Sequence, residues 1–262
     1  MRILVCCHIF YSELWEELKP CIALLPQQQT RLQITMCKDD PDLSRKILAE
    51  FPDAQIRVLE NRGYDIAPFI DTVNGVNLDD FDFIVKLHTK RNIRECFCHV
   101  NYRWIYGKRW RRMLLKFISS PTAVNQTLAL FREDPTIGMV GNGDCWIDYE
   151  RYNMPYDSTF IAPELKRLGI KTQERGFLSG TMFICRAEIF KPLQHKIAFT
   201  DFPAVADHRT NLSHAYEMMF GVLVYENKLR FSDYRSRPLG LPRMLFLRKL
   251  FFRILYRCKS YL

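Results

Sequence analysis

The sequence has no apolar run near the roughly 18–20 residues of a membrane-spanning helix, so we do not expect an integral membrane protein. Glycine (11) and proline (13) are too scarce among 262 residues for a fibrous or low-complexity chain. The apolar start, Met1–Phe10, is followed by no small-residue cleavage site, and we interpret it as a first β-strand, not a signal peptide. The composition, 48% hydrophobic and 26% charged, is that of a soluble globular chain.

The nine cysteines contain no CxxC pair. Their odd number, with most of them inside apolar runs, favours reduced core thiols in the cytoplasm over disulfides. Cys96, Cys98 and His99, with His88 nearby in the sequence, are residue types that bind metals. Because no second ligand pair follows, we do not expect a zinc site.

The net charge of +9 is concentrated at the C-terminal end. The segment Lys228–Leu262 holds ten Lys or Arg residues and one acid, so the rest of the chain carries 28 charges of each sign. We therefore expect no nucleic acid partner for the domain itself. The basic run Lys108–Lys116 is interleaved with core-type residues, which makes RNA binding a weak alternative.

Residues 233–262 form a basic C-terminal tail, in which Pro242 opens a predicted amphipathic helix. Its apolar positions at helical spacing are Met244, Leu247, Phe251 and Leu255, and its basic stripe is Lys249, Arg253 and Arg257. This pattern is typical of a helix on an anionic membrane surface. We expect a cytoplasmic protein peripherally associated with the inner leaflet of the inner membrane. A helix that packs on a partner subunit is the alternative.

Residues 1–232 alternate strand-like and helical patterns with short connections, which predicts an α/β domain with a mostly parallel central sheet flanked by helices. The expected strands are Arg2–His8, Leu32–Cys37, Gln55–Leu59, Asp82–Leu87, Ile137–Gly141 and Thr181–Cys185. The expected helices are Glu13–Leu25, Asp42–Phe51, Ile66–Val73, Arg111–Ile118, Thr122–Phe131 and Leu212–Tyr225. Ligands of such sheets bind beyond the carboxyl ends of the strands.

Four cationic or potentially cationic residues cluster at the end of the strand Asp82–Leu87, namely Lys86, His88, Lys90 and Arg91. Such groups repel one another unless an anion lies between them. A diphosphate fits this need, and Thr89 can add a hydrogen bond. The alternative is a solvated basic loop with a surface histidine.

Two other strand ends carry polar or aromatic residues. His8, Phe10 and Tyr11 follow the first strand. After Gln55–Leu59, the series Asn61, Arg62 and Gly63 favours a turn with positive φ at the glycine. Asp65 then begins a short helix, which it can cap while it binds a hydroxyl or a base edge. A plain turn followed by an N-cap is the alternative.

These segments resemble the rhamnan synthesis protein F family, in the right order over about residues 2–232. The similar segments are Asn61–Phe69, Lys86–Arg91, Gly180–Phe183 and His214–Glu217, with His8–Tyr11 and Trp110–Arg112 as further signature points. The resemblance implies a GT-A-like nucleotide-sugar transferase fold. Asn92 departs from the family pattern, in which serine commonly follows the basic run.

Family members are bacterial glycosyltransferases, or proteins like them, in cell-surface polysaccharide assembly. The resemblance therefore implies transfer of a sugar, with rhamnose expected, from a dTDP- or GDP-linked donor to a glycan or lipid-linked acceptor in rhamnan or O-antigen synthesis. The alternative is a non-catalytic sugar-binding or scaffold subunit of an assembly complex.

The resemblance also bears on metal use. GT-A enzymes carry an Asp-x-Asp metal motif where this sequence reads His88-Thr89-Lys90. Divalent cations prefer oxygen ligands, which His and Lys do not supply. We therefore expect no metal cofactor, and a transferase in which His88 and Lys90 neutralise the leaving diphosphate.

An inverting transferase needs a base for the acceptor hydroxyl, and Glu217 is the first candidate. His214 lies one helical turn before it and can orient it or contact sugar. The other candidate bases are Asp148, Asp201 and Asp207. Gly180 and Thr181 allow the backbone to approach a sugar closely. Trp104, Trp110 and Trp146 can stack on sugars, although core positions are favoured for at least two of them.

Overall fold

The computed structural model describes residues 1–98, 104–148, 157–172, 176–204, 212–237 and 239. The predicted amphipathic helix after Pro242 and the candidate base Asp207 lie outside these residues. In the described parts of the chain, no helix combines the length and apolarity that crossing a membrane requires.

A seven-stranded sheet forms the centre of the fold, in the order β3-β2-β1-β4-β10-β7-β11. Its strands are β1 (Ile3–Ile9), β2 (Thr30–Met36), β3 (Gln55–Val58), β4 (Phe83–His88), β7 (Ile137–Gly141), β10 (Phe183–Arg186) and β11 (Arg230–Asp233). Neighbours are parallel except at β10, which is antiparallel to both β4 and β7. The predicted α/β class with a mostly parallel sheet is confirmed; β11 was not predicted.

The central strands are apolar because helices cover both of their faces. Every residue of β1 and β4 is buried, as expected of inner parallel strands. His8, Lys86 and His88 are the polar or charged residues of these two strands, and they lie toward the carboxyl ends. The sheet thus carries its buried polar groups at the edge where ligands of such folds bind.

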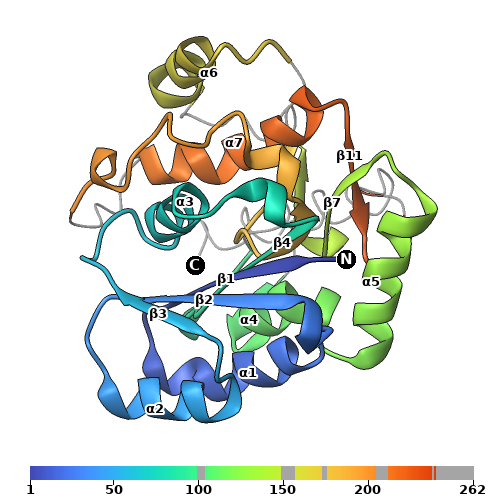
Figure 1. The fold of residues 1–262 in the computed structure, drawn as a ribbon. Helices are drawn as coiled ribbons and strands as arrows, with labels where there is room; N and C mark the ends of the chain where they lie inside the picture. Colours follow the sequence, from blue (N-terminus) through green and yellow to red (C-terminus); the bar gives the residue numbers. More distant parts are fainter. Residues whose placement is uncertain (99–103, 149–156, 173–175, 205–211, 238, 240–262) are drawn as a thin grey trace, which may run out of the picture.

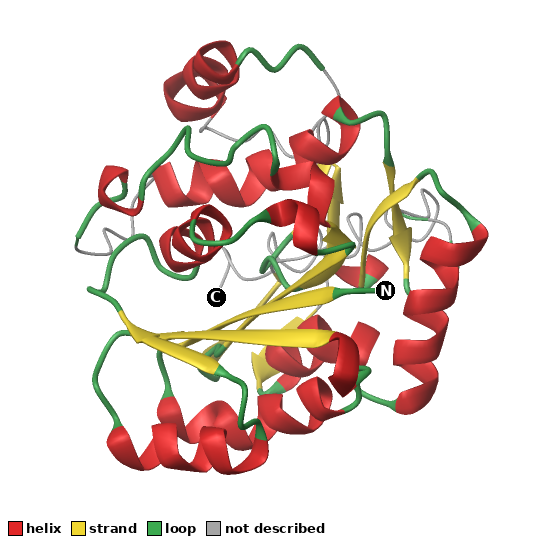
Figure 2. Cartoon of the chain, viewed as in Figure 1, coloured by secondary structure: helices red, strands yellow, loops and turns green. Residues whose placement is uncertain are grey.

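The helices are α1 (Trp15–Ala23), α2 (Pro41–Glu50), α3 (Ile66–Asn74), α4 (Arg109–Leu114), α5 (Pro121–Glu133), α6 (Ala162–Leu168) and α7 (Leu212–Glu226). Helices α3 and α7 lie on one face of the sheet, and α1, α2 and α4 on the other, giving three layers (Figures 1 and 2). Side chains of Asp40 and Ser120 cap α2 and α5. The six expected helices are confirmed, and α6 was not predicted.

The reversed strand β10 has a direct consequence for the site. Phe183, at its start, pairs with Lys86, near the carboxyl end of β4. Residues that precede β10 therefore reach the same edge as residues that follow β1 and β4. Gly180 and Thr181 arrive at this edge in that way, each with positive φ (80° and 44°).

Two small antiparallel pairs complete the fold, β5 (Ile93–Cys98) with β6 (Trp104–Gly107), and β8 (Trp146–Asp148) with β9 (Gly176–Leu178). Trp110 and Trp146 are only 5% and 8% exposed. Both are core residues, as favoured for at least two of the tryptophans, and a sugar-stacking role for them is wrong.

Candidate functional site

A cavity of about 370 Å³ opens at the carboxyl ends of β1 and β4; we call it the first cavity. It is lined by His8, Phe10, Tyr11, Asn61, Tyr64, Asp65, His88, Thr89, Lys90 and Arg91. The structure thus brings together residues from all three strand ends that the sequence singled out.

A second cavity of about 200 Å³ adjoins the first. It is lined by Tyr64, Asp65, Ile66, Lys90, Gly180, Thr181, Ser213, His214 and Glu217. Tyr64, Asp65 and Lys90 line both cavities. The predicted base and the predicted diphosphate residues therefore lie around one continuous site.

Lys86 does not face a ligand. Its side chain is 1% exposed and forms an ion pair with Asp65. Its Nζ also donates to the Thr181 hydroxyl at 2.9 Å and the Thr181 carbonyl at 3.3 Å. The prediction that a bound anion compensates Lys86 is wrong, because the protein supplies the anion in Asp65. The Asp65 side chain makes no capping bond to α3, so the predicted cap is also wrong.

Asp65 is held as a carboxylate. Burial would raise its pKa, but His88, Lys86 and Lys90 nearby, together with the hydrogen bond from Lys86, hold the pKa well below its ordinary value. The Thr181 hydroxyl donates to Asp65 Oδ2 at 3.0 Å. The contacts of Asp65 with Lys86, Thr181 and His88 all involve Oδ2, so among the described residues its other oxygen can accept a ligand hydroxyl at the junction of the two cavities.

His88 is buried in the wall of the first cavity, beside Asp65. Burial lowers its pKa well below the ordinary value; Lys86 and Lys90 lower it further, and Asp65 opposes them. Its Nδ1 lies 3.3 Å from Asp65 Oδ2, yet neither ring nitrogen has a hydrogen-bond partner within the described part of the chain. Burial therefore works against a positive charge on His88, and its predicted role toward a diphosphate stays a prediction. A neutral imidazole in the wall of the first cavity can donate one hydrogen bond to a ligand or accept one.

Thr89 joins the two sides of the first cavity. Its Oγ1 accepts the backbone N–H groups of Phe10 and Tyr11 at 2.9 and 3.0 Å, and its own N–H donates to the His8 carbonyl at 3.0 Å. With both acceptor positions of Oγ1 in use, the hydroxyl proton is the group left to offer. Thr89 can therefore act as a donor to an anionic ligand.

Lys90 and Arg91 supply the positive charge of the first cavity. Across the residues that the structure describes, neither has an ion-pair partner. Lys90 is half-buried and Arg91 is exposed. Of the four predicted cations, these two are the ones whose charge a ligand can meet.

The opposite end of the first cavity is polar and uncharged. His8 Nδ1 lies 2.9 Å from the Thr35 hydroxyl, and His8 Nε2 lies 3.7 Å from Cys37 Sγ. Burial lowers the pKa of His8 to about 4, so this imidazole is neutral. Asn61 lies beside Cys37, with 3.9 Å between Sγ and Oδ1. This end presents hydrogen-bonding groups without net charge.

Phe10 and Tyr11 form an aromatic shelf at the mouth of the first cavity. Their ring centroids are 4.8 Å apart, and Phe10 is 47% exposed. An exposed aromatic ring beside a polar cavity offers a flat surface to a ring-shaped ligand.

Arg62 and Gly63 shape the turn that precedes α3. Gly63 has φ 60°, which confirms the predicted turn, and a Cβ there would lie 2.6 Å from that of Ala67. Arg62 Nη1 donates to the Phe202 carbonyl at 2.6 Å and the Thr200 carbonyl at 3.3 Å. Neither residue is among the described residues that line the two cavities, and the predicted ligand contact of both stays a prediction.

Glu217 faces the second cavity from α7. Its Oε1 accepts the backbone N–H of Gly180 at 2.8 Å, which fixes the carboxylate at the cavity wall. His214 packs edge-on against Tyr64, with 5.5 Å between ring centroids. The rival base Asp201 instead accepts the N–H of Ala198 at 2.8 Å and is exposed.

The other rival base, Asp148, ends β8, and the structure describes its backbone only. Sequence reasoning missed Tyr64, whose φ of 54° is strained for a tyrosine and which stands between the two cavities. Its position between the already singled-out Gly63 and Asp65 was the available signal.

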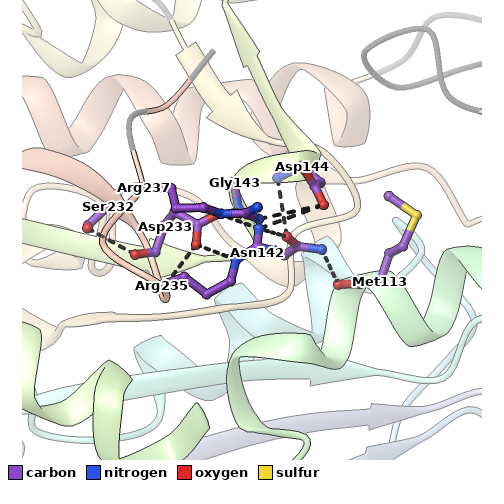
Figure 3. Close-up of polar contacts among 8 residues, drawn as sticks. All are labelled: Met113, Asn142, Gly143, Asp144, Ser232, Asp233, Arg235 and Arg237. Carbon is purple, nitrogen blue, oxygen red and sulfur yellow. Dashed lines mark hydrogen bonds and ion pairs between the residues drawn. The ribbon is translucent and has the colours of Figure 1, made fainter. Parts of the chain in front are cut away.

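Sequence reasoning also missed a polar cluster at the carboxyl ends of β7 and β11 (Figure 3). Arg235 binds both carboxylate oxygens of Asp233, at 2.9 and 2.7 Å. Gly143 donates its N–H to Asp233 at 3.0 Å, and Asn142 donates to the Met113 carbonyl at 2.8 Å. These bonds anchor the segment that follows β11 to the edge of the sheet.

Known proteins resemble this chain to different extents. It is 26% identical over 238 residues to the WxcX protein of two strains of Xanthomonas campestris pv. campestris, which covers 83% of this chain. The chain spans about 30% of the length of these curated relatives.

Two solved structures are also similar. S. aureus TarS is 12% identical with a TM-score of 0.47, over 89% of this chain and 58% of that one. The mannosyltransferase PcManGT from Pyrobaculum calidifontis, in complex with GDP-Man and Mn2+, is 15% identical with a TM-score of 0.42, over 82% of this chain and 50% of that one.

The family comparison covers most of the chain. The sequence profile described as RgpF, rhamnan synthesis protein F, matches residues 1–229. This range includes every strand-end segment that lines the two cavities, and the predicted family is confirmed. The chain belongs to the rhamnan synthesis protein F family.

Proposed function

We propose that this chain is a glycosyltransferase of bacterial surface polysaccharide synthesis. It takes a sugar from a nucleotide-diphosphate donor and passes it to a hydroxyl of a glycan or lipid-linked acceptor. The description of the family, rhamnan synthesis, favours rhamnose as the sugar and a dTDP- or GDP-linked donor.

The polarity of the first cavity is the observation that carries this proposal. One end offers the uncharged groups of His8 and Asn61, the mouth offers the aromatic shelf, and the other end offers Lys90 and Arg91. A nucleoside diphosphate has the same order of parts: an uncharged ring with polar edges, then an anionic diphosphate. Cationic side chains and the Thr89 hydroxyl match the diphosphate oxygens.

The second cavity would hold the sugar and the acceptor. In an inverting transfer, Glu217 takes the proton of the acceptor hydroxyl while that oxygen bonds to the anomeric carbon. The bond from the anomeric carbon to the diphosphate oxygen breaks, and the nucleoside diphosphate leaves with the electron pair. Lys90 lines both cavities and can stabilise the charge that develops on it.

The residues at this place do not fit a divalent metal. His88 and Lys90 replace the carboxylates of the metal motif in GT-A enzymes, and the neighbouring carboxylate of Asp65 is already bound to Lys86. A hard cation would need oxygen ligands and would compete with the buried ammonium group of Lys86. We therefore propose a reaction with no metal step, in which Lys90, Arg91 and Thr89 carry the leaving group.

The cellular setting belongs to the proposal as well. A lipid-linked acceptor would be met at the cytoplasmic face of the inner membrane, and the basic tail suits peripheral binding to anionic lipid there. Residues 1–227 carry no net positive charge of the kind that nucleic-acid-binding domains use. This charge and the family description favour a nucleotide-sugar ligand over a nucleic acid.

A donor screen tests the proposed function. The purified chain is titrated with dTDP-, GDP- and UDP-linked sugars by thermal shift, and release of nucleoside diphosphate is then measured with bacterial lipid extract as acceptor, with and without EDTA. We expect one donor to raise the melting temperature and to be turned over in EDTA. Binding without turnover would favour the non-catalytic sugar-binding subunit. Loss of turnover in EDTA, restored by Mg²⁺ or Mn²⁺, would contradict the metal-free reaction.

A further inference from the structure

Arg111, in α4, is 1% exposed and makes four hydrogen bonds. Its Nε and Nη2 donate to the two carboxylate oxygens of Glu17 at 2.7 and 2.6 Å. Its Nη1 donates to the Lys90 carbonyl at 2.7 Å and to Asn92 Oδ1 at 3.0 Å. A guanidinium has five N–H groups, so these bonds leave no pair of donors for a phosphate. Arg111 is therefore committed to protein contacts.

These contacts join two segments beside the first cavity. Glu17 lies in α1, which follows the aromatic shelf of Phe10 and Tyr11. Lys90 and Asn92 lie in the loop that follows β4. Thr89 already binds this loop to the backbone of the shelf. The loop is thus held from two sides, by Thr89 at its start and by Arg111 farther along.

We infer that Arg111, through its ion pair with Glu17, is a positioning residue for the diphosphate end of the first cavity. The inference rests on the proposed function. By holding the Lys90 carbonyl and the Asn92 side chain, Arg111 fixes the loop residues from which Lys90 and Arg91 present their charges. Arginine suits this place because its planar fork binds a carboxylate with two bonds and still donates from Nη1; lysine has no such fork.

Asn92 adds a side-chain contact to the hold on this loop. Its side-chain oxygen reaches Arg111 directly at 3.0 Å. Arg111 therefore holds the loop through one backbone carbonyl and one side chain.

The test compares Arg111→Lys with Arg112→Lys. Arg112 is the exposed next residue of α4, so the second variant makes the same chemical change without breaking the bridge. Affinities for dTDP and GDP, and for thymidine and guanosine, are measured by calorimetry, and folding is checked by thermal unfolding. For the nucleotide that wild type binds, we expect Arg111→Lys to weaken diphosphate binding at least tenfold and to change nucleoside binding less than twofold. Arg112→Lys should match wild type.

Glu17→Gln gives a second, independent variant, because it removes the ion pair and leaves Arg111 intact. It should shift the diphosphate affinity in the same direction. If wild type binds neither dTDP nor GDP, the proposed donor is wrong and the inference falls with it. If wild type binds one of them, and Arg111→Lys and Glu17→Gln bind that nucleotide with wild-type affinity, the Arg111 inference alone is overturned. It is also overturned if both variants unfold or lose nucleoside and diphosphate affinity equally, since Arg111 would then be a general structural brace.

Discussion

Lys86, at the end of β4, and Asp65, at the start of α3, form an ion pair in which the lysine is 1% exposed. Asp65 lines both cavities, and its pairing partner Lys86 is buried behind it. A ligand entering the site therefore meets the carboxylate of Asp65 and the ammonium of Lys90, and not the ammonium of Lys86. We therefore expect substitution of the buried Lys86 to affect folding and substitution of the cavity residue Lys90 to affect binding.

Lys86→Met should destabilise the fold. It leaves the Asp65 carboxylate without its buried counter-charge, and breaking a buried pair in this way lowers the free energy of unfolding by about 3–5 kcal/mol. Urea denaturation measures the loss. Lys191→Met removes the exposed partner of Asp79 and should change the free energy by at most about 1 kcal/mol. Equal small effects of both variants would contradict the importance of the buried pair.

Lys90→Ala should leave the fold intact and weaken the donor. A lost charge-assisted hydrogen bond reduces the binding free energy of the nucleoside diphosphate by about 1.5–3 kcal/mol, while the affinity for the nucleoside stays as in wild type. Isothermal titration measures both. Lys38→Ala, an exposed lysine after β2, is the matched control. Equal losses for nucleoside and diphosphate would place Lys90 away from the phosphates.

Glu217→Gln should separate binding from turnover. The amide oxygen can still accept the Gly180 N–H, so donor affinity is preserved, but an amide cannot take the acceptor proton. We expect turnover to fall by about two to four orders of magnitude, the span of a general base. Asp201→Asn, on the exposed rival, should keep full turnover. Wild-type turnover in Glu217→Gln would return the search for the base to Asp148 and Asp207.

Acid should destabilise the protein through its buried histidines. His8 has a folded-state pKa of about 4 against an ordinary 6.5, so below pH 6.5 the unfolded chain binds a proton that the folded chain does not. The contribution of His8 to the free energy of unfolding is therefore fully present above pH 6.5. It is lost as the pH drops toward 4, which lowers the free energy of unfolding by about 3 kcal/mol. His88, whose pKa is also lowered by burial, adds in the same direction.

Unfolding midpoints measured at pH 4.5 and pH 7.5 test this dependence. The first pH lies between the folded-state and the ordinary pKa of His8, and the second lies above both. His8→Asn, which can retain the bond to Thr35, should flatten the difference. His195→Asn, on an exposed histidine, should leave it unchanged. A difference that survives intact in His8→Asn would show that other groups cause it.

Truncation after Arg237 should leave a folded domain that no longer binds anionic vesicles. The main sheet ends with β11 at Asp233, and Arg235 anchors the following segment, so both are retained. Each basic residue of the tail near such a surface contributes about 1 kcal/mol, so full-length binding should weaken as salt rises. Cosedimentation with anionic and neutral vesicles measures this. A full-length chain that ignores anionic vesicles, or a truncated chain that unfolds, would favour a packed tail.

Local patterns predicted much of the fold. Buried parallel strands such as β1 and β4 are continuous apolar runs, and the Gly63 turn follows from the conformational freedom of glycine. The strand-end rule also selected most residues that line the first cavity. These features depend on neighbours in the sequence, which is why they can be read from it.

Charge pairing could not be predicted in the same way. Lys86 lies 21 residues from Asp65 and 95 from Thr181, so its partners depend on how the strands are ordered. The sequence shows four cationic or potentially cationic residues within six positions. Only the topology reveals that Lys86 is paired with Asp65 and that burial lowers the pKa of His88. The contacts of Arg111 could not be predicted for the same reason, since its partners lie 94 residues away in Glu17 and 21 away in Lys90.

The reversed strand β10 also has a consequence for synthesis of the chain. When the ribosome has made β1 to β4, the edge of β4 that β10 later covers has no partner, and an unpaired strand edge invites association with other chains. Both Thr181 acceptors of Lys86 are translated 95 residues after it. This edge of β4 can therefore gain its partner strand only after the residues between β4 and β10 have been synthesised.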